Sequence, residues 1–243
     1  MVKEKSIDID ISLEELLEAG CHFGHSVSKI HPQMREYVYA ARQGVHIFDL
    51  VKTRQRLIVA AQFLADLVKV GGKVIFVGTK RQAAPIIEKK VKKTGMFYIK
   101  KRWIGGLLTN WTEVRKNLEK LIDLKKGVDR GRGGRTKYEQ VLLKREYSRL
   151  EEFYGGISGL TDMPQALFVV DVKREKTAIL EAKKMGIPVV AIVDTNNSPS
   201  GIDYVIPAND DAKGSIDYIV GKIMEVIKKN KLKVKTQKPK VKK

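Results

Sequence analysis

The sequence holds a single cysteine, Cys21, among its 243 residues, so it cannot form an internal disulfide framework. It also lacks any apolar run of the roughly 18–20 residues that span a bilayer. Signal and transit peptides exclude acidic residues, yet acidic side chains are frequent near the start of the chain: Glu4, Asp8, Asp10, Glu14, Glu15 and Glu18. We therefore expect a cytoplasmic protein with no membrane partner.

Acidic residues are few beside the basic ones, with 28 Asp+Glu against 47 Lys+Arg and a formal net charge of +19. Such an excess attracts polyanions, and in the cytoplasm nucleic acid is the leading class. Residues 228–243 contain nine lysines and no acid, so we expect residues 230–243 to form a basic disordered tail. The sequence leaves open whether this tail is a general polyanion-binding segment or docks at one place.

Strands and helices alternate along most of the chain. Continuously apolar strands are expected at 73–78, 166–171 and 189–194, because such runs are typical of strands buried on both faces. Segments whose apolar residues recur at helical spacing lie before or after these strands, at about 52–70, 81–94, 173–185 and 212–229. The pattern predicts an α/β fold with a parallel sheet between two layers of helices. Residues 21–32 carry no periodic pattern and are expected to be irregular.

Residues 107–154 break this alternation. Their apolar residues step by four and three, as in a heptad seam: Leu107, Trp111, Val114, Leu118 and Leu121, then Leu143, Tyr147, Leu150 and Tyr154. We predict an antiparallel coiled-coil helical hairpin inserted at 107–154 into an α/β body formed by 1–106 and 155–229. The alternative is a pair of helices lying flat on that body.

Basic residues gather at two places suited to RNA phosphates. The predicted hairpin tip, 125–137, combines arginines with glycines that let a phosphate chain approach closely, although a merely solvated loop is the alternative. The second place is the turn after the strand at 73–78 together with the segment before Trp103, a residue for which core packing is favoured over base stacking. The predicted RNA-binding residues are Lys80, Arg81, Lys100, Lys101, Arg102, Arg130, Arg132 and Arg135.

Several aspartates follow predicted strands and are expected at the carboxyl edge of the sheet. With a histidine, such a group could hold a structural divalent ion, and the candidate ligands are His22, Asp194, Asp210 and Asp211, with Asp171 nearby. Helix capping and loop hydrogen bonds are the alternative roles. The grouping of Cys21, His22, His25 and His31 does not have the spacing of a structural zinc site. Apart from this candidate ion, no cofactor is expected.

The rival function is an enzyme that acts on a nucleotide or phosphorylated metabolite with these aspartates. Gly78-Thr79-Lys80 does not make a phosphate-binding loop, because Thr precedes Lys and the preceding residues are the strand itself. No nucleophile–base motif is evident either. A peripheral membrane protein would need an amphipathic helix with an aromatic-rich face, which the sequence does not offer. We therefore predict no catalytic residue and no small-molecule substrate.

Six segments, in order and with matching spacing, resemble the ribosomal protein S2 family of the bacterial small subunit: residues 16–25, 45–53, 76–80, 102–110, 187–196 and 206–211. The resemblance runs from about residue 7 to 229. It implies a flavodoxin-like three-layer body with a coiled-coil hairpin, which binds small-subunit ribosomal RNA near the head–body junction beside other ribosomal proteins. It also implies a structural role in subunit assembly and translation, without catalysis. Pro164-Gln165 departs from the expected Pro-Asp, and the Arg-Gly tip and lysine tail lie outside the shared pattern.

Overall fold

The computed structural model describes residues 9–129, 131 and 136–237, with residues 231–237 described in their backbone only. Its largest sheet has five parallel strands: β4 (Val74–Val77), β5 (Phe97–Ile99), β6 (Ala166–Val170), β7 (Val189–Val193) and β8 (Tyr204–Pro207). Their order is β5-β4-β6-β7-β8. Numbered within this sheet, that is 2-1-3-4-5, one of the common orders of doubly wound sheets. The predicted α/β class is confirmed.

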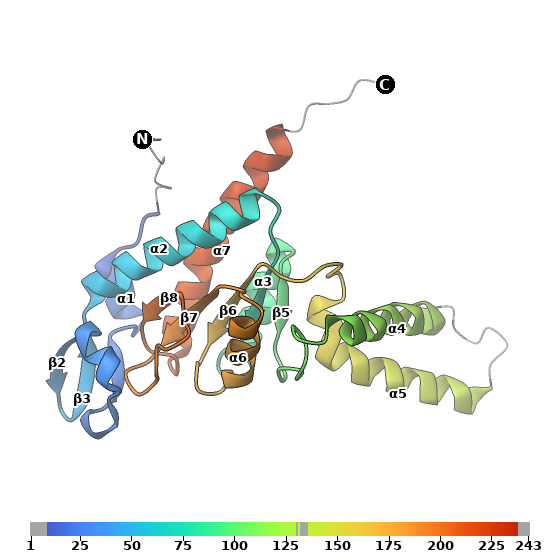
Figure 1. The fold of residues 1–243 in the computed structure, drawn as a ribbon, viewed down its shortest axis with the longest axis horizontal. Helices are drawn as coiled ribbons and strands as arrows, with labels where there is room; N and C mark the ends of the chain where they lie inside the picture. The colour runs from blue at the N-terminus through green and yellow to red at the C-terminus, as the bar shows by residue number, and fades with distance from the viewer. Residues whose placement is uncertain (1–8, 130, 132–135, 238–243) are drawn as a thin grey trace.

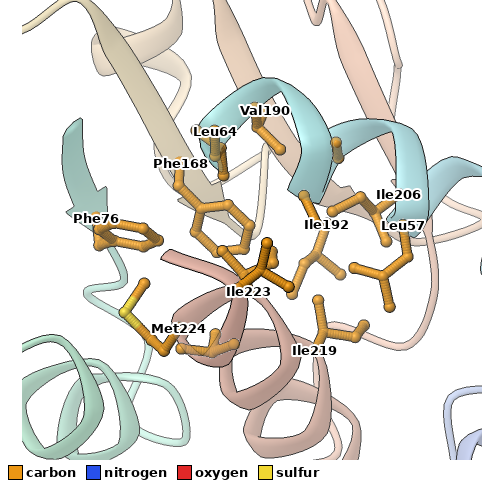
Figure 2. Packing of buried hydrophobic residues seen from close by; sticks show 14 of the residues in the cluster. Leu57, Leu64, Phe76, Phe168, Val190, Ile192, Ile206, Ile219, Ile223 and Met224 are labelled. Atoms are coloured by element: carbon orange, nitrogen blue, oxygen red, sulfur yellow. The ribbon is translucent and has the colours of Figure 1, made fainter. Parts of the chain in front are cut away.

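The strands are apolar throughout because helices or loops cover both faces of the sheet. One face packs against α2 (Leu50–Lys69), α3 (Ala84–Thr94) and α7 (Lys213–Gln237). Figure 2 shows Ile223 of α7 beside Phe168 and Ile192 of the strands. Alternate strand residues point to the opposite face, where α6 (Lys176–Lys184) and the segment 103–108 cover them.

A second, three-stranded antiparallel sheet lies near the N-terminus, next to α1 (Leu13–Glu18). It has the order β1-β3-β2, with β1 (Phe23–Ser26), β2 (Val38–Arg42) and β3 (Val45–Phe48). Short 3₁₀ helices at Val27–Lys29 and Pro32–Tyr37 join β1 to β2. The expectation that residues 21–32 are irregular is therefore wrong for β1. This strand is set by tertiary contacts, since a Cβ on Gly24 would lie 2.6 Å from Thr195 Cγ2 on the loop after β7.

Two helices, α4 (Trp111–Asp129) and α5 (Lys137–Tyr154), lie side by side and extend away from the sheet (Figure 1). The pair does not lie flat on the body (Figure 1), which was the alternative to a protruding hairpin. The predicted seam residues Val114, Leu118 and Leu121 are buried. Helix α5 begins at a capping box in which the side chains of Thr136 and Glu139 bond each other's backbone N–H groups. The winding of the pair as a coiled coil stays a prediction.

Helix α7 continues to Gln237 rather than ending near 229. The tail expected to be disordered from residue 230 is thus helical in its first part, and residues 238–243 lie outside the described residues. Lysine is a good helix former, so a helix already packed on the sheet can be extended through it. Among the residues that the structure describes, no helix is long and apolar enough to cross a membrane.

Candidate nucleic-acid interface

The five parallel strands end at the same edge of the sheet, and Lys80 stands there in the turn after β4. Its ammonium Nζ lies 2.7 Å from Asp210 Oδ1, 2.7 Å from Asp211 Oδ1 and 3.3 Å from Asp171 Oδ2. Only 13% of the Lys80 side chain is exposed. The ammonium group therefore faces carboxylates inside the protein. For this reason we do not propose Lys80 as a contact for RNA phosphates.

The charges of this cluster depend on one another. Burial would by itself lower the pKa of Lys80, but its hydrogen bonds to Asp210 and Asp211 outweigh burial and raise that pKa. Burial raises the pKa of Asp210 to about 7, an effect that the nearby carboxylates increase and Lys80 opposes. Lys80 thus stays charged at neutral pH and holds the carboxyl ends of β4, β6 and β8 together.

A histidine does join these aspartates, but it is His25 and not His22. His25 Nδ1 lies 3.1 Å from Asp194 Oδ1, and His25 Nε2 lies 3.5 Å from Asp211 Oδ2. The hydrogen bond to Asp194 raises the pKa of His25. His22 instead packs against Phe23, with the ring centroids 3.9 Å apart. The predicted gathering of aspartates is found, and within it the potential ligand atoms of His25, Asp194 and Asp211 lie within 4.8 Å of one another.

The point where the strand order reverses, between β4 and β6, is where doubly wound sheets bind phosphorylated ligands. Here the backbone N–H of Thr79 donates to the buried Glu175 Oε1 at 3.2 Å, and the Thr79 hydroxyl donates to the same oxygen. Arg174 Nε donates to Thr79 Oγ1 at 2.8 Å. A phosphate placed beside Thr79 would meet the carboxylate of Glu175, which already accepts from this N–H group and this hydroxyl.

Arg81, which follows β4, and residues 100–102, which follow the parallel strand β5, lie near the same edge of the sheet. Arg81 and Arg102 are exposed and have no acidic partner among the described residues. Lys100 Nζ lies 2.6 Å from Glu88 Oε1, and Lys101 Nζ lies 2.7 Å from Glu152 Oε1. Exposed pairs of this kind are weak, so a phosphate can compete for either lysine. The remaining predicted residues, Arg130, Arg132 and Arg135, lie outside the described residues.

Sequence reasoning missed a buried carboxylate that shapes this surface. Glu181 of α6 accepts hydrogen bonds from Trp103 Nε1 at 3.1 Å, Gly106 N at 2.8 Å and Leu108 N at 3.0 Å. Trp103 is buried at 6% exposure, as its predicted core packing requires. The carboxylate fixes the loop that carries Arg102 and leads into α4. A glutamate in an amphipathic helix gives no signal of this role.

Comparison with models of protein families matches residues 16–230 to the family described as Ribosomal protein S2. The matched range includes both sheets, the helical pair and the carboxylate cluster around Lys80. A match over most of the chain agrees with the resemblance seen in six separate segments of the sequence. The chain belongs to the ribosomal protein S2 family, a family of structural proteins of the small ribosomal subunit.

Proposed function

We propose that the protein binds small-subunit ribosomal RNA and, as a structural constituent, supports subunit assembly and translation in the cytoplasm. Its partners are that RNA and the neighbouring small-subunit proteins, and it performs no reaction. Membership of the ribosomal protein S2 family supports this role.

The observation that carries the proposal is the pair of exposed guanidinium groups on Arg81 and Arg102, which lack acidic partners among the described residues. They lie on a protein whose net charge is +19. Arginine contacts phosphates through several donors in a fixed plane. Lys100 and Lys101 add positive charge, because an incoming phosphate can replace Glu88 and Glu152 as their partners. Backbone contacts of this kind give affinity, while the shape of the RNA gives specificity.

The helical pair extends the surface that RNA can reach. As an antiparallel coiled-coil hairpin, it would carry Arg130, Arg132 and Arg135 to the far end of α4 and α5, between the described ends Asp129 and Thr136. Each phosphate neutralised by such a residue releases counterions. The hairpin tip therefore adds to the salt dependence of binding.

The test is the binding of the purified full chain to a small-subunit ribosomal RNA transcript, measured over a range of salt concentrations. For Arg81→Ala and Arg102→Ala, we expect weaker binding and a log–log salt slope shallower by roughly 0.7–0.9 per lost contact. The control is Arg115→Ala, which removes the same charge from α4 at a residue whose Nε donates to Glu119 at 3.1 Å.

Two results would overturn the proposal. One is a transcript affinity no greater than that for unrelated RNA of equal length at moderate salt. The other is a salt slope that Arg81→Ala and Arg102→Ala leave equal to that of Arg115→Ala.

A further inference from the structure

We propose that a recess at the root of the helical pair binds one unpaired RNA nucleotide, its phosphate held by Arg102 and Arg149 and its base against Phe153. This inference rests on the proposed RNA-binding function and names a specific place and ligand within it. The root is where α4 starts and α5 ends, beside β5 (Figure 1). The recess has a volume of about 420 Å³. Pockets that bind small ligands span roughly 300–1,000 Å³, so one nucleotide is of suitable size.

The recess is built from three parts of the chain. The segment from Arg102 to Gly105 forms one wall, and one face of each helix of the pair forms the others. On α5 the lining residues include Glu146, Arg149 and Phe153, which share a face because they are spaced by three and four residues. The position of the first wall is fixed by Glu181, which bonds the Trp103 indole and the Gly106 N–H.

The charge of the recess favours an anion. Its charged lining residues are three cations, Arg102, Lys120 and Arg149, and one carboxylate, Glu146, a net charge of +2. Lys120 Nζ lies 2.6 Å from Glu146 Oε1, so these two neutralise each other across the helical pair. Arg102 and Arg149 are both exposed and have no acidic partner within the described part of the chain. Their two guanidinium groups are the ones available to a phosphate.

The remaining lining is apolar and partly aromatic, which a phosphate alone does not require. Phe153, Ile104 and Leu150 line the recess and are only partly buried. Unpaired bases are bound by stacking on aromatic rings beside arginine, whereas a duplex keeps its bases stacked inside. A concave site with two unpaired guanidinium groups and an accessible phenylalanine therefore suits an unpaired nucleotide better than a duplex. An acidic peptide would meet the same charge but has no nucleobase to lie against Phe153 beside the two arginines, so the recess suits RNA better.

The test uses the full chain and two fluorescent RNA probes, a single-stranded hexaribonucleotide and the same sequence annealed as a duplex. We expect wild-type protein to prefer the single strand. We expect Arg149→Ala and Phe153→Leu each to weaken hexanucleotide binding at least about fivefold, since one lost base-stacking or charged contact has effects of this size. Phe153→Leu keeps an apolar side chain in place, and circular dichroism with thermal unfolding checks that each variant folds.

The matched control is Arg145→Ala, one turn earlier on α5, where an exposed arginine lies outside the recess lining. It should weaken hexanucleotide binding less than twofold at the same salt concentration. Equal losses in Arg145→Ala and Arg149→Ala, or unchanged binding in a folded Phe153→Leu variant, would overturn the inference. If wild-type protein still binds ribosomal transcript tightly in that case, only this inference fails and the proposed function stands.

A second measurement identifies the occupant in the assembled subunit. After ultraviolet irradiation of native small subunits, we expect a nucleotide adduct on the peptide that contains Phe153. A crosslink from this peptide to another protein, with no nucleotide adduct, would mean that a protein segment fills the recess and would overturn the assignment to RNA.

Discussion

Glu181 of α6 accepts a hydrogen bond from the indole N–H of Trp103 across 3.1 Å and so ties the sheet body to the loop that precedes the helical pair. The same carboxylate also accepts from the backbone N–H groups of Gly106, Leu108 and Thr109. Several donors that would otherwise be buried without partners thus depend on one side chain. The position of Arg102, next to Trp103, depends on it as well.

Replacing Glu181 by glutamine should therefore destabilise the protein. The amide has the same shape, but it loses the charge and one of its two acceptor atoms, which leaves buried N–H groups unsatisfied. We expect Glu181→Gln to lower the free energy of unfolding by about 3 kcal/mol, measured by urea denaturation. The control Glu225→Gln changes an exposed residue of α7 and should stay within about 0.5 kcal/mol. A Glu181→Gln protein as stable as this control would contradict the role assigned to the carboxylate.

The effect of Glu181 should also depend on pH, with a defined sign. Burial alone would raise the pKa of Glu181, but the hydrogen bonds from Gly106, Trp103, Leu108 and Thr109 outweigh it, so its folded pKa lies below the ordinary value of 4.5. A depressed folded pKa gives stability that is present above pH 4.5 and is lost as the pH falls through the folded pKa. The difference in unfolding free energy between wild type and Glu181→Gln should thus be full at about pH 6 and shrink in more acid solution. A difference that grows on acidification would contradict this assignment.

The central strands could be predicted from the sequence because their pattern is local. Runs such as Val74–Val77 and Val189–Val193 are apolar at every position, and burial on both faces explains why. The aspartates could be placed at one edge for a related reason, since all strands of a parallel sheet end there. Local pattern and topology together were enough for the layers and for the position of this cluster.

The partners of individual side chains could not be predicted in the same way. Lys80 meets Asp210, which is 130 residues away in the chain, and Glu181 meets Trp103, which is 78 residues away. Nothing near Lys80 in the sequence distinguishes a lysine paired with carboxylates from one that faces solvent. Strand β1 was missed because its four residues are held by β3 and by the close contact of Gly24 with Thr195. These features depend on how distant segments pack.

Removing the charge of Lys80 should destabilise the carboxylate cluster. Asp210 is 2% exposed, and in Lys80→Met it would lose its cation while Asp171 and Asp194 remain near it. We expect a loss of about 3 kcal/mol in unfolding free energy at pH 7 and above, because breaking a buried pair leaves an uncompensated charge. The loss should become smaller as the pH falls, since the raised pKa of Asp210 lets the variant take up a proton and relieve the repulsion.

The control for this charge change is Lys89→Met, at an exposed residue of α3, which should change the stability by less than about 0.5 kcal/mol. Both variants are compared by urea denaturation between about pH 5 and pH 8, a range that spans the raised pKa of Asp210, about 7. If Lys80→Met is as stable as Lys89→Met at pH 8, Lys80 does not hold the strand ends together. Its pairing with the aspartates would then be no argument against a contact with RNA.

The segment that connects α5 to the body passes very close to the backbone of β5. A Cβ on Gly156 would lie 2.1 Å from the carbonyl oxygen of Tyr98 in β5, and a backbone atom of a central layer cannot move aside cheaply. Gly156→Ala should therefore cost about 3 kcal/mol in unfolding free energy, the upper range for overpacking. At Gly105, on the other connection to the helical pair, an added Cβ would meet nothing within 4 Å, so Gly105→Ala should be nearly neutral. Thermal unfolding of the two variants compares the same chemical change at both connections. A Gly156→Ala protein that unfolds at the temperature of Gly105→Ala would mean that the end of α5 joins β5 less tightly than the structure has it.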